Sequence, residues 1–302
     1  MTKILLVLLW PAGIAAILAI AALLARRAAP AAPAGSSPVT PPVAGRASRH
    51  GAPAGGRVAA RQGGLPPAVR SAAKFLLIVV AGAVAVYGLT ALLGLLVVHA
   101  GPTIDKPIMN WTNAHRVHSW AAVMNRLTKI GDTWTTWGAV TAAAVCLAVT
   151  WHRNRWLPPL ALAAAIVVDH YTTIYIRHTF ERPGPPGSPH GTFPSGGADR
   201  IIILYGLIAY LLWHEFSRQR RAGIWAGATV AVLAFSEGYS RGYLTLHWFT
   251  DVLSGWVYGG LLLLLFIFAV RYTEASSGGA GHPGRRGTAR GAAREPIAGR
   301  PG

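Results

Sequence analysis

The chain has 302 residues, of which 52% are hydrophobic and only 13% are charged, whereas soluble domains carry about 25% charged residues. This deficit excludes an ordinary soluble domain and points to a lipid bilayer as the solvent. The net charge is +18. Because the basic residues stand in short runs between apolar stretches and are not interleaved with aromatic residues, nucleic acid is not the expected partner. The one cysteine, Cys146, excludes an intramolecular disulfide and a cysteine metal cluster.

Apolar stretches of about 20 residues are long enough to cross a bilayer as helices. By this measure the sequence predicts an all-α polytopic membrane helix bundle, with a six-helix core and one extra transmembrane helix at the N-terminus. The predicted helices are 4–24, 75–99, 135–151, 156–176, 201–213 with a start as early as 195, 224–235 with an extension toward 239, and 246–270.

Composition divides the chain into four parts. Residues 1–25 form the extra helix, and 74–272 form the membrane domain. Residues 26–73, rich in Ala, Pro, Gly and Arg, and the basic tail 273–302 are predicted to be disordered. A cleaved signal peptide is the alternative for the first helix; its length favours a retained helix. Between the second and third helices, 101–134 is predicted to be an interfacial helix pair and part of a lipid entrance.

Loop charges predict the orientation in the membrane. Loops on alternate sides divide the 28 Lys and Arg residues unequally. The linker, the turns near Arg155 and Arg220 and the tail hold most of them, so this side is expected to be cytoplasmic. We therefore predict a multi-pass plasma-membrane protein whose other, extracytoplasmic face carries 181–200 and 239–247.

Three segments whose residues could bind a ligand or take part in a reaction meet at that outer face. In the last one, His247 and Asp251 are spaced i, i+4 and share a helix face, so the carboxylate can accept the Nδ1 proton and leave Nε2 free to attack. Ser240 and Arg241 precede them, and Arg241 brings a planar cation suited to phosphate oxygens. Alone, such a pair favours a histidine of the aromatic belt and an ion pair at the membrane edge, but an ionisable cluster at a transmembrane helix end favours a functional site.

The other two segments supply further anion-binding groups. Ser195 can cap the fifth helix, where the free N–H groups of Gly196 and Gly197 form a phosphate cradle. Alone, this pattern is more often an ordinary helix cap. Arg182, followed by Pro183, ends the fourth helix and is equally compatible with an anchor at headgroup level. Within the predicted spans, Asp169 and Glu237 are expected to pair inside the bundle.

Together the segments resemble the signature of the type 2 phosphatidic acid phosphatase (PAP2) superfamily, in its bacterial lipid phosphatase branch. The family pattern is Lys, six residues, Arg-Pro; then Pro-Ser-Gly-His; then Ser-Arg, five residues, His, three residues, Asp. The third element is complete here, from Ser240 to Asp251. The resemblance covers about 75–272, six helices, and excludes the first helix, the linker and the tail.

The resemblance implies a membrane lipid phosphatase. In that family's chemistry, His247 attacks phosphorus and becomes phosphohistidine, and Asp251 orients it. Arg182, Arg241 and the backbone beside Ser195 hold the phosphoryl oxygens. The implied reaction needs no metal and no cofactor, and its partners are a lipid phosphate or diphosphate and the surrounding membrane lipids.

The sequence departs from the family pattern at two positions. The family lysine falls at Tyr175, which can donate one neutral hydrogen bond to phosphate; Arg177 is about 200° further round the helix and is expected to face elsewhere. The histidine that protonates the leaving group falls at Gly197. General acid catalysis contributes roughly 10² to 10⁴ in rate, so the enzyme is weakened or inactive, or His178 or His190 replaces the acid.

A third explanation is substrate choice. An alkoxide leaving a monophosphate needs a proton, whereas a lipid phosphate leaving a diphosphate has a second pKa of about 6 and can leave unprotonated. The expected substrate is therefore a diphosphate lipid such as a polyprenyl diphosphate. Two rivals remain open: a catalytically inactive protein that binds phospholipid or a membrane partner, and a phosphotransferase with an acceptor other than water.

Overall fold

The computed structural model describes residues 67–151, 154–188 and 191–278. Within these ranges the chain forms helices and no strand, as the sequence predicts. The elements, in order, are α2 (Pro67–Ala114), η1 (His118–Trp120), α3 (Ala121–Leu127), η2 (Thr128–Gly131), α4 (Thr133–Thr150), α5 (Leu157–Phe180), α6 (Gly196–Arg200), η3 (Ile201–Tyr205), α7 (Gly206–Phe216), α8 (Arg220–Tyr243) and α9 (Phe249–Gly278).

Five helical stretches of the described chain are long and apolar enough to cross a membrane: Val69–Ala114, Thr133–Thr150, Leu157–Phe180, Gly196–Phe216 and Phe249–Ser276. Each overlaps one predicted span, with ends that differ by a few residues in several of them, so the protein is a multi-pass membrane protein. The remaining predicted core span corresponds to α8, which has 24 residues but is not among the five. Its ends carry Arg220, Arg221, Glu237 and Arg241, which lower its apolar character. The predicted first helix, residues 26–66 of the predicted linker and residues 279–302 of the predicted tail lie outside the described residues. The prediction of disorder is wrong for 67–73 and 273–278, which are helical because they extend α2 and α9 beyond their apolar spans.

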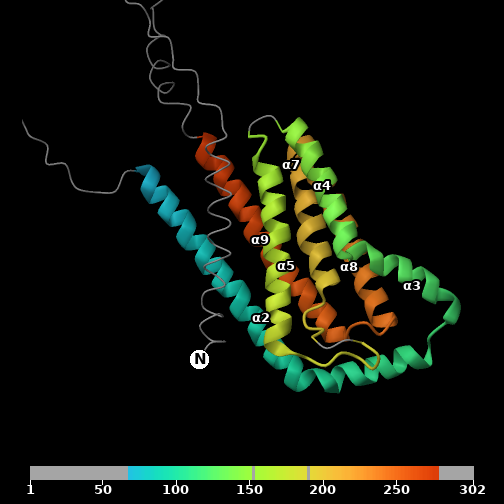
Figure 1. Cartoon of the computed structure of the whole chain (residues 1–302). Helices are drawn as coiled ribbons and strands as arrows, with labels where there is room; N and C mark the ends of the chain where they lie inside the picture. The colour runs from blue at the N-terminus through green and yellow to red at the C-terminus, as the bar shows by residue number, and fades with distance from the viewer. Residues whose placement is uncertain (1–66, 152–153, 189–190, 279–302) are drawn as a thin grey trace, which may run out of the picture.

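Helix α2 is much longer than predicted and changes direction. The sequence predicts that it ends near residue 99, yet it continues to Ala114 with Pro102 and Pro107 inside it. In Figure 1 α2 runs diagonally beside the bundle and then turns across its lower end. A proline inside a helix removes one hydrogen bond and clashes with the preceding turn, which accounts for the bend. The predicted interfacial pair is thus the turned end of α2 followed by α3.

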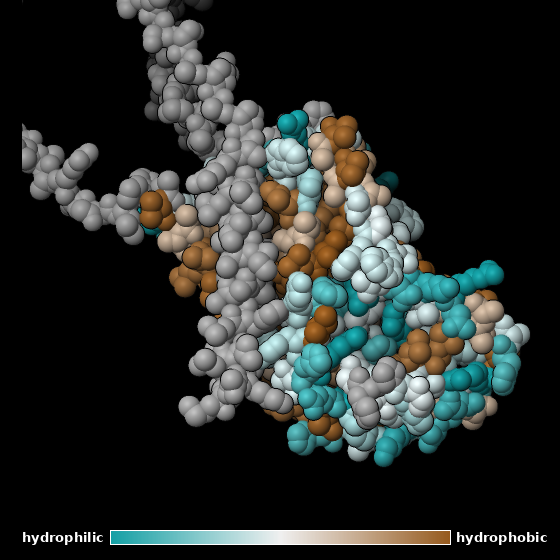
Figure 2. All heavy atoms as spheres, in the orientation of Figure 1, coloured by the Kyte–Doolittle hydropathy of each residue, from teal (hydrophilic) through white to brown (hydrophobic). Residues whose placement is uncertain are grey.

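Helix α9 lies at the centre of the packing and contacts α2, α5 and α6. Two glycines allow its close approach to α6: a Cβ at Gly255 would lie 2.7 Å from the Ser195 carbonyl oxygen, and one at Gly259 2.7 Å from that of Asp199. Figure 2 shows apolar side chains along the flank of the bundle and hydrophilic ones at the lower end, where α3 and the loops lie. The functional segments lie at that polar end.

Candidate functional site

A tight turn after α8 brings His247 to the site. Thr245 has a positive φ of 55°, and the N–H of Leu246 donates to the carbonyl of Arg241 at 2.9 Å. The chain thereby reverses direction within a few residues and enters α9 at Phe249. The backbone N–H of Trp248 donates to Oδ2 of Asp251 at 3.2 Å, so the carboxylate caps the start of α9. The sequence motif therefore encodes a turn and a cap as well as reactive groups.

The His247 side chain is buried, and its Nδ1 lies 3.0 Å from the Thr192 carbonyl oxygen. A carbonyl can only accept, so Nδ1 carries the proton and Nε2 has a free lone pair. This differs from the predicted partner, since Oδ2 of Asp251 lies 3.9 Å from Nδ1, beyond hydrogen-bond distance. The expected tautomer is present, but a backbone carbonyl from another segment fixes it.

The environment of His247 keeps the imidazole neutral. Burial lowers its pKa well below the ordinary value, and the positive charges of Arg241 and Arg177 lower it further. The hydrogen bond to Thr192 acts in the opposite direction and is outweighed. A neutral imidazole with a free Nε2 is the form that can act as a nucleophile.

Arg182 is held in a buried ion-pair network. Its Nη2 donates to Oδ2 of Asp105 at 2.6 Å, and its Nη1 donates to Asp251. Thr250 joins the network, because its backbone N–H and its hydroxyl both donate to Asp105. Two carboxylates thus neutralise the buried cation. Arg182 does not line the polar pocket described next, in contrast to its expected role as a phosphate ligand; it links α5, α2 and α9.

A polar pocket of about 330 Å³ opens beside His247. It is lined by Asp132, Thr133, Arg177, Ser188, Gly191, Thr192, Gly197, Arg200, Arg241, Leu246 and His247. Two of the three predicted segments therefore meet around one space, the second through Gly197 and the third through Arg241 and His247, whereas the first, with Arg182, does not line it. Three arginines against one lining carboxylate give the pocket a net positive charge, which favours an anion.

Two of these arginines were not expected from the sequence. Arg177 donates through Nε and Nη2 to the Pro194 carbonyl oxygen, both at 3.3 Å. Arg200 donates through Nη1 to the Gly131 carbonyl at 2.8 Å, and its Nε lies 3.6 Å from Asp169. The expectation that Arg177 faces away is wrong, because helix α5 turns this residue, and not Tyr175, toward the pocket. Arg200 could have been found from its i+3 spacing to Gly197.

Four expected phosphate-binding residues lie outside the lining of the polar pocket: Tyr175, Ser195, Gly196 and Ser240. The Tyr175 ring packs toward Tyr87, with ring centroids 6.1 Å apart. Ser195 is fully buried at the start of α6, and its side chain makes no capping hydrogen bond. The Ser240 hydroxyl donates to the carbonyl of Glu237 at 2.6 Å.

The two histidines considered as replacement acids are not in the pocket lining. His178 lines a neighbouring hollow of about 580 Å³ together with Arg177, Glu181 and Gly191. His190 lies outside the described residues. The acidic side chain in the lining of the polar pocket is that of Asp132. Its Oδ1 lies 3.4 Å from Nη2 of Arg241.

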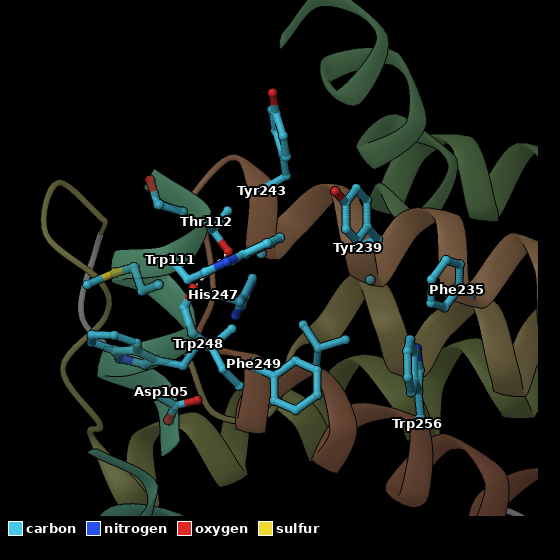
Figure 3. Close-up of a pocket in the computed structure, with 16 residues that line it drawn as sticks. Asp105, Trp111, Thr112, Phe235, Tyr239, Tyr243, His247, Trp248, Phe249 and Trp256 are labelled. Atoms are coloured by element: carbon cyan, nitrogen blue, oxygen red, sulfur yellow. Dashed lines mark hydrogen bonds between the residues drawn. The ribbon is translucent and has the colours of Figure 1, made fainter. Parts of the chain in front are cut away.

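A second, mainly apolar pocket of about 200 Å³ also reaches His247. Figure 3 shows the imidazole beside aromatic rings from three elements, α2, α8 and α9. The labelled apolar lining consists of Trp111, Phe235, Tyr239, Tyr243, Trp248, Phe249 and Trp256. His247 thus lines both an arginine-rich pocket and an aromatic one.

Residues 140–274 match the model of the PAP2 superfamily. No match was found among curated proteins. Among solved structures, the chain is similar to a transmembrane PAP2-type phosphatidylglycerolphosphate phosphatase from Bacillus subtilis, at 22% identity and a TM-score of 0.56, over 64% of this chain and 96% of that one. LpxE from Aquifex aeolicus has 18% identity and a TM-score of 0.42, over 56% and 96%. The first likeness shows a shared fold; the second adds no argument.

Proposed function

Since residues 140–274 belong to the PAP2 superfamily, we propose that this membrane protein removes phosphate from a lipid phosphate or diphosphate through a phosphohistidine at His247. One observation carries the proposal: His247 lies where the arginine-rich pocket meets the aromatic one. A ligand that fills both spaces has an anionic end and a hydrocarbon end. Lipid phosphates have this character, and their phosphorus would then lie beside Nε2.

In the proposed reaction, Nε2 of His247 attacks phosphorus, the bond from phosphorus to the lipid oxygen breaks, and water later hydrolyses the phosphohistidine. The guanidinium groups of Arg177, Arg200 and Arg241 hold the equatorial oxygens and neutralise charge in the transition state. The Thr192 carbonyl accepts the hydrogen bond from Nδ1, so the proton stays on Nδ1. The negative charge of Asp251 stabilises the positively charged ring of the intermediate. The N–H group of Gly197, which lines the pocket, adds a hydrogen bond.

A diphosphate lipid, such as a polyprenyl diphosphate, is the proposed substrate class. With Gly197 in place of the family histidine, a leaving group that needs no proton is favoured, and a lipid phosphate is such a group. The three lining arginines support the same choice, because the diphosphate group brings more negative charge than the phosphate monoester of a lipid monophosphate.

We place the site on the extracytoplasmic face. The basic turns near Arg155 and Arg220 belong to the opposite ends of the helices, and most loop Lys and Arg residues share their side. This distribution is typical of the cytoplasmic side. A lipid phosphate in the outer leaflet would reach the site through the aromatic pocket.

Phosphate release from a panel of lipid monophosphates and diphosphates tests the proposal, with purified protein in detergent or vesicles and His247→Ala as the blank. We expect release from at least one lipid, faster from polyprenyl diphosphate than from phosphatidic acid. Faster hydrolysis of phosphatidic acid would rule out the proposed preference, and release that is equal in the His247→Ala protein would rule out the mechanism.

The vacant general-acid position favours one second candidate, a protein that binds phospholipid without hydrolysing it. Both candidates predict binding of anionic lipid, and they differ in chemistry. A phosphoryl group trapped on His247 during turnover supports the phosphatase. Binding of lipid phosphates without phosphate release from any member of the panel supports the binding protein.

A further inference from the structure

Glu237 lies behind one of the arginines of the polar pocket. It is fully buried on α8, one helical turn before Arg241, and its Oε1 accepts a hydrogen bond from Nε of Arg241. Arg241 lines the pocket and Glu237 does not. The carboxylate therefore holds the guanidinium from the side away from the pocket, which leaves the Nη atoms facing the pocket and Asp132.

Two glycines from different segments make room for this carboxylate. A Cβ at Gly131 would lie 2.6 Å from Oε1 of Glu237, and a Cβ at Gly197 would lie 2.6 Å from Cζ of Arg241 and still closer to Oε1 of Glu237. Contacts this short would force the side chains to shift. Neither can move freely, because Glu237 is buried and is hydrogen-bonded to Arg241. The Glu237–Arg241 pair thus fills the space that a side chain at 197 would need.

We propose that Glu237 is the positioning residue for Arg241, and that Gly197 is required because this ion pair occupies its side-chain space. The proposal rests on the proposed function and explains the departure at 197: the position lacks a histidine because the phosphate-binding arginine is held there from behind. A guanidinium fixed through Nε meets phosphate without first being reordered, so it binds more tightly. Without the carboxylate, Asp132 competes for Arg241 and draws it away from phosphate.

Glu237→Gln tests the positioning role, since it keeps the shape and removes the charge. We expect the concentration of orthovanadate or inorganic phosphate that half-saturates the protein to rise about tenfold, the size of one weakened charge-assisted hydrogen bond, and KM to rise more than kcat falls. In an Arg241→Gln background the same change should add nothing, since the two residues act as one unit. Glu274→Gln is the control, because it removes a carboxylate paired with His214, 3.3 Å away, outside the site.

Gly197→Ala tests the requirement for glycine. We expect it to lower the melting temperature and weaken phosphate binding in the wild-type background. It should be tolerated better in Glu237→Ala, where the carboxylate is gone and the guanidinium of Arg241 is released to move aside. Gly260→Ala is the control, since its Cβ would meet nothing within 4 Å.

Binding is measured by the shift of the melting temperature with inorganic phosphate or orthovanadate, so it does not depend on turnover. If no lipid is hydrolysed but binding requires Glu237 and Gly197, the proposed phosphatase fails and the positioning role stands. Unchanged phosphate binding in Glu237→Gln, full stability of Gly197→Ala, or an absence of phosphate binding by the wild-type protein each overturns the inference.

Discussion

At the scale of single residues, the site combines a neutral imidazole with a concentration of positive charge. Arg200 and Arg241 each lie beside a buried carboxylate, Asp169 and Glu237 respectively, so their charges are partly balanced from behind while their guanidinium groups line the pocket. This arrangement lets cations remain in a largely buried place without an anion present. In the proposed reaction, a phosphoryl group adds the missing negative charge on the pocket side.

Arg177 is predicted to replace the charge that Tyr175 does not supply. Arg177→Gln should raise KM or lower kcat/KM by about 10- to 100-fold, because a hydrogen bond to a charged group is worth about 1.5–3 kcal/mol. Tyr175→Phe is the matched control and should have little effect, since the Tyr175 ring packs toward Tyr87. Steady-state kinetics with the best lipid of the panel measures both. A larger loss in Tyr175→Phe would mean that the helix face is assigned wrongly.

The buried His247 should make stability depend on pH. Burial lowers its folded-state pKa, so the unfolded chain takes up a proton at this residue below about pH 6.5 while the folded chain does not. Stability is therefore lost as the pH falls from about 6.5 toward the lower folded pKa. The melting temperature of the wild-type protein should fall more between about pH 7.5 and about pH 5.5 than that of His247→Gln. Parallel decreases in the two proteins would contradict the lowered pKa.

The residue pattern in the sequence predicts part of this site and misses another part for geometric reasons. The spacing from Ser240 to Asp251 correctly brings Arg241 and His247 to one pocket, because a turn and a helix start are local structures. The partner of Nδ1 could not be predicted, since the Thr192 carbonyl comes from a loop 55 residues earlier. Arg177 was missed because spacing fixes the angle between two residues on a helix but not which of them faces the pocket.

At the scale of elements, the bent helix α2 closes the polar end of the bundle. Its turned end brings Asp105 to Arg182, just beyond the end of α5, and to Thr250 on α9. Three helices that are distant in sequence are thus tied together just below the site. The long apolar run of α2 predicts the membrane span. The local sequence does not predict that the helix continues past Pro102 and Pro107, or that Asp105 contacts Arg182 and Thr250.

Removing the charge of Asp105 should loosen this junction. Asp105→Asn leaves Arg182 with one carboxylate and should cost about 3 kcal/mol, near the lower end for a broken buried ion pair. Activity should also fall, since Arg182 holds Asp251 next to His247. Chemical unfolding in detergent measures the free energy, and the exposed neighbour Lys106→Gln is the control. Equal stability of the two variants would show that the junction contributes nothing.

At the scale of the whole molecule, the chain presents an apolar flank and two different ends. The end with α3 and the loops carries both pockets, and the turn between α7 and α8 lies at the other end (Figure 1). Charge counts along the sequence predict which end is cytoplasmic. The bundle itself carries no direction across a membrane, so this assignment needs a separate test.

Cysteine labelling in intact cells tests the orientation. Cys146 is the chain's one cysteine, so Cys146→Ala gives a background without thiols. Ser119→Cys, in η1 near α3, should react with a membrane-impermeant maleimide in intact cells, whereas Ser217→Cys, at the turn after α7, should react only after lysis. Both serines are exposed. The reverse pattern would place the site on the cytoplasmic side.

The most direct test of the account is to identify the residue that carries the phosphoryl group during turnover. Rapid quenching of the purified protein with a ³²P-labelled diphosphate lipid, followed by peptide mapping, should find an acid-labile label on His247. The label and phosphate release should both be lost in His247→Ala. A label on a different residue, or undiminished phosphate release by His247→Ala, would contradict the account.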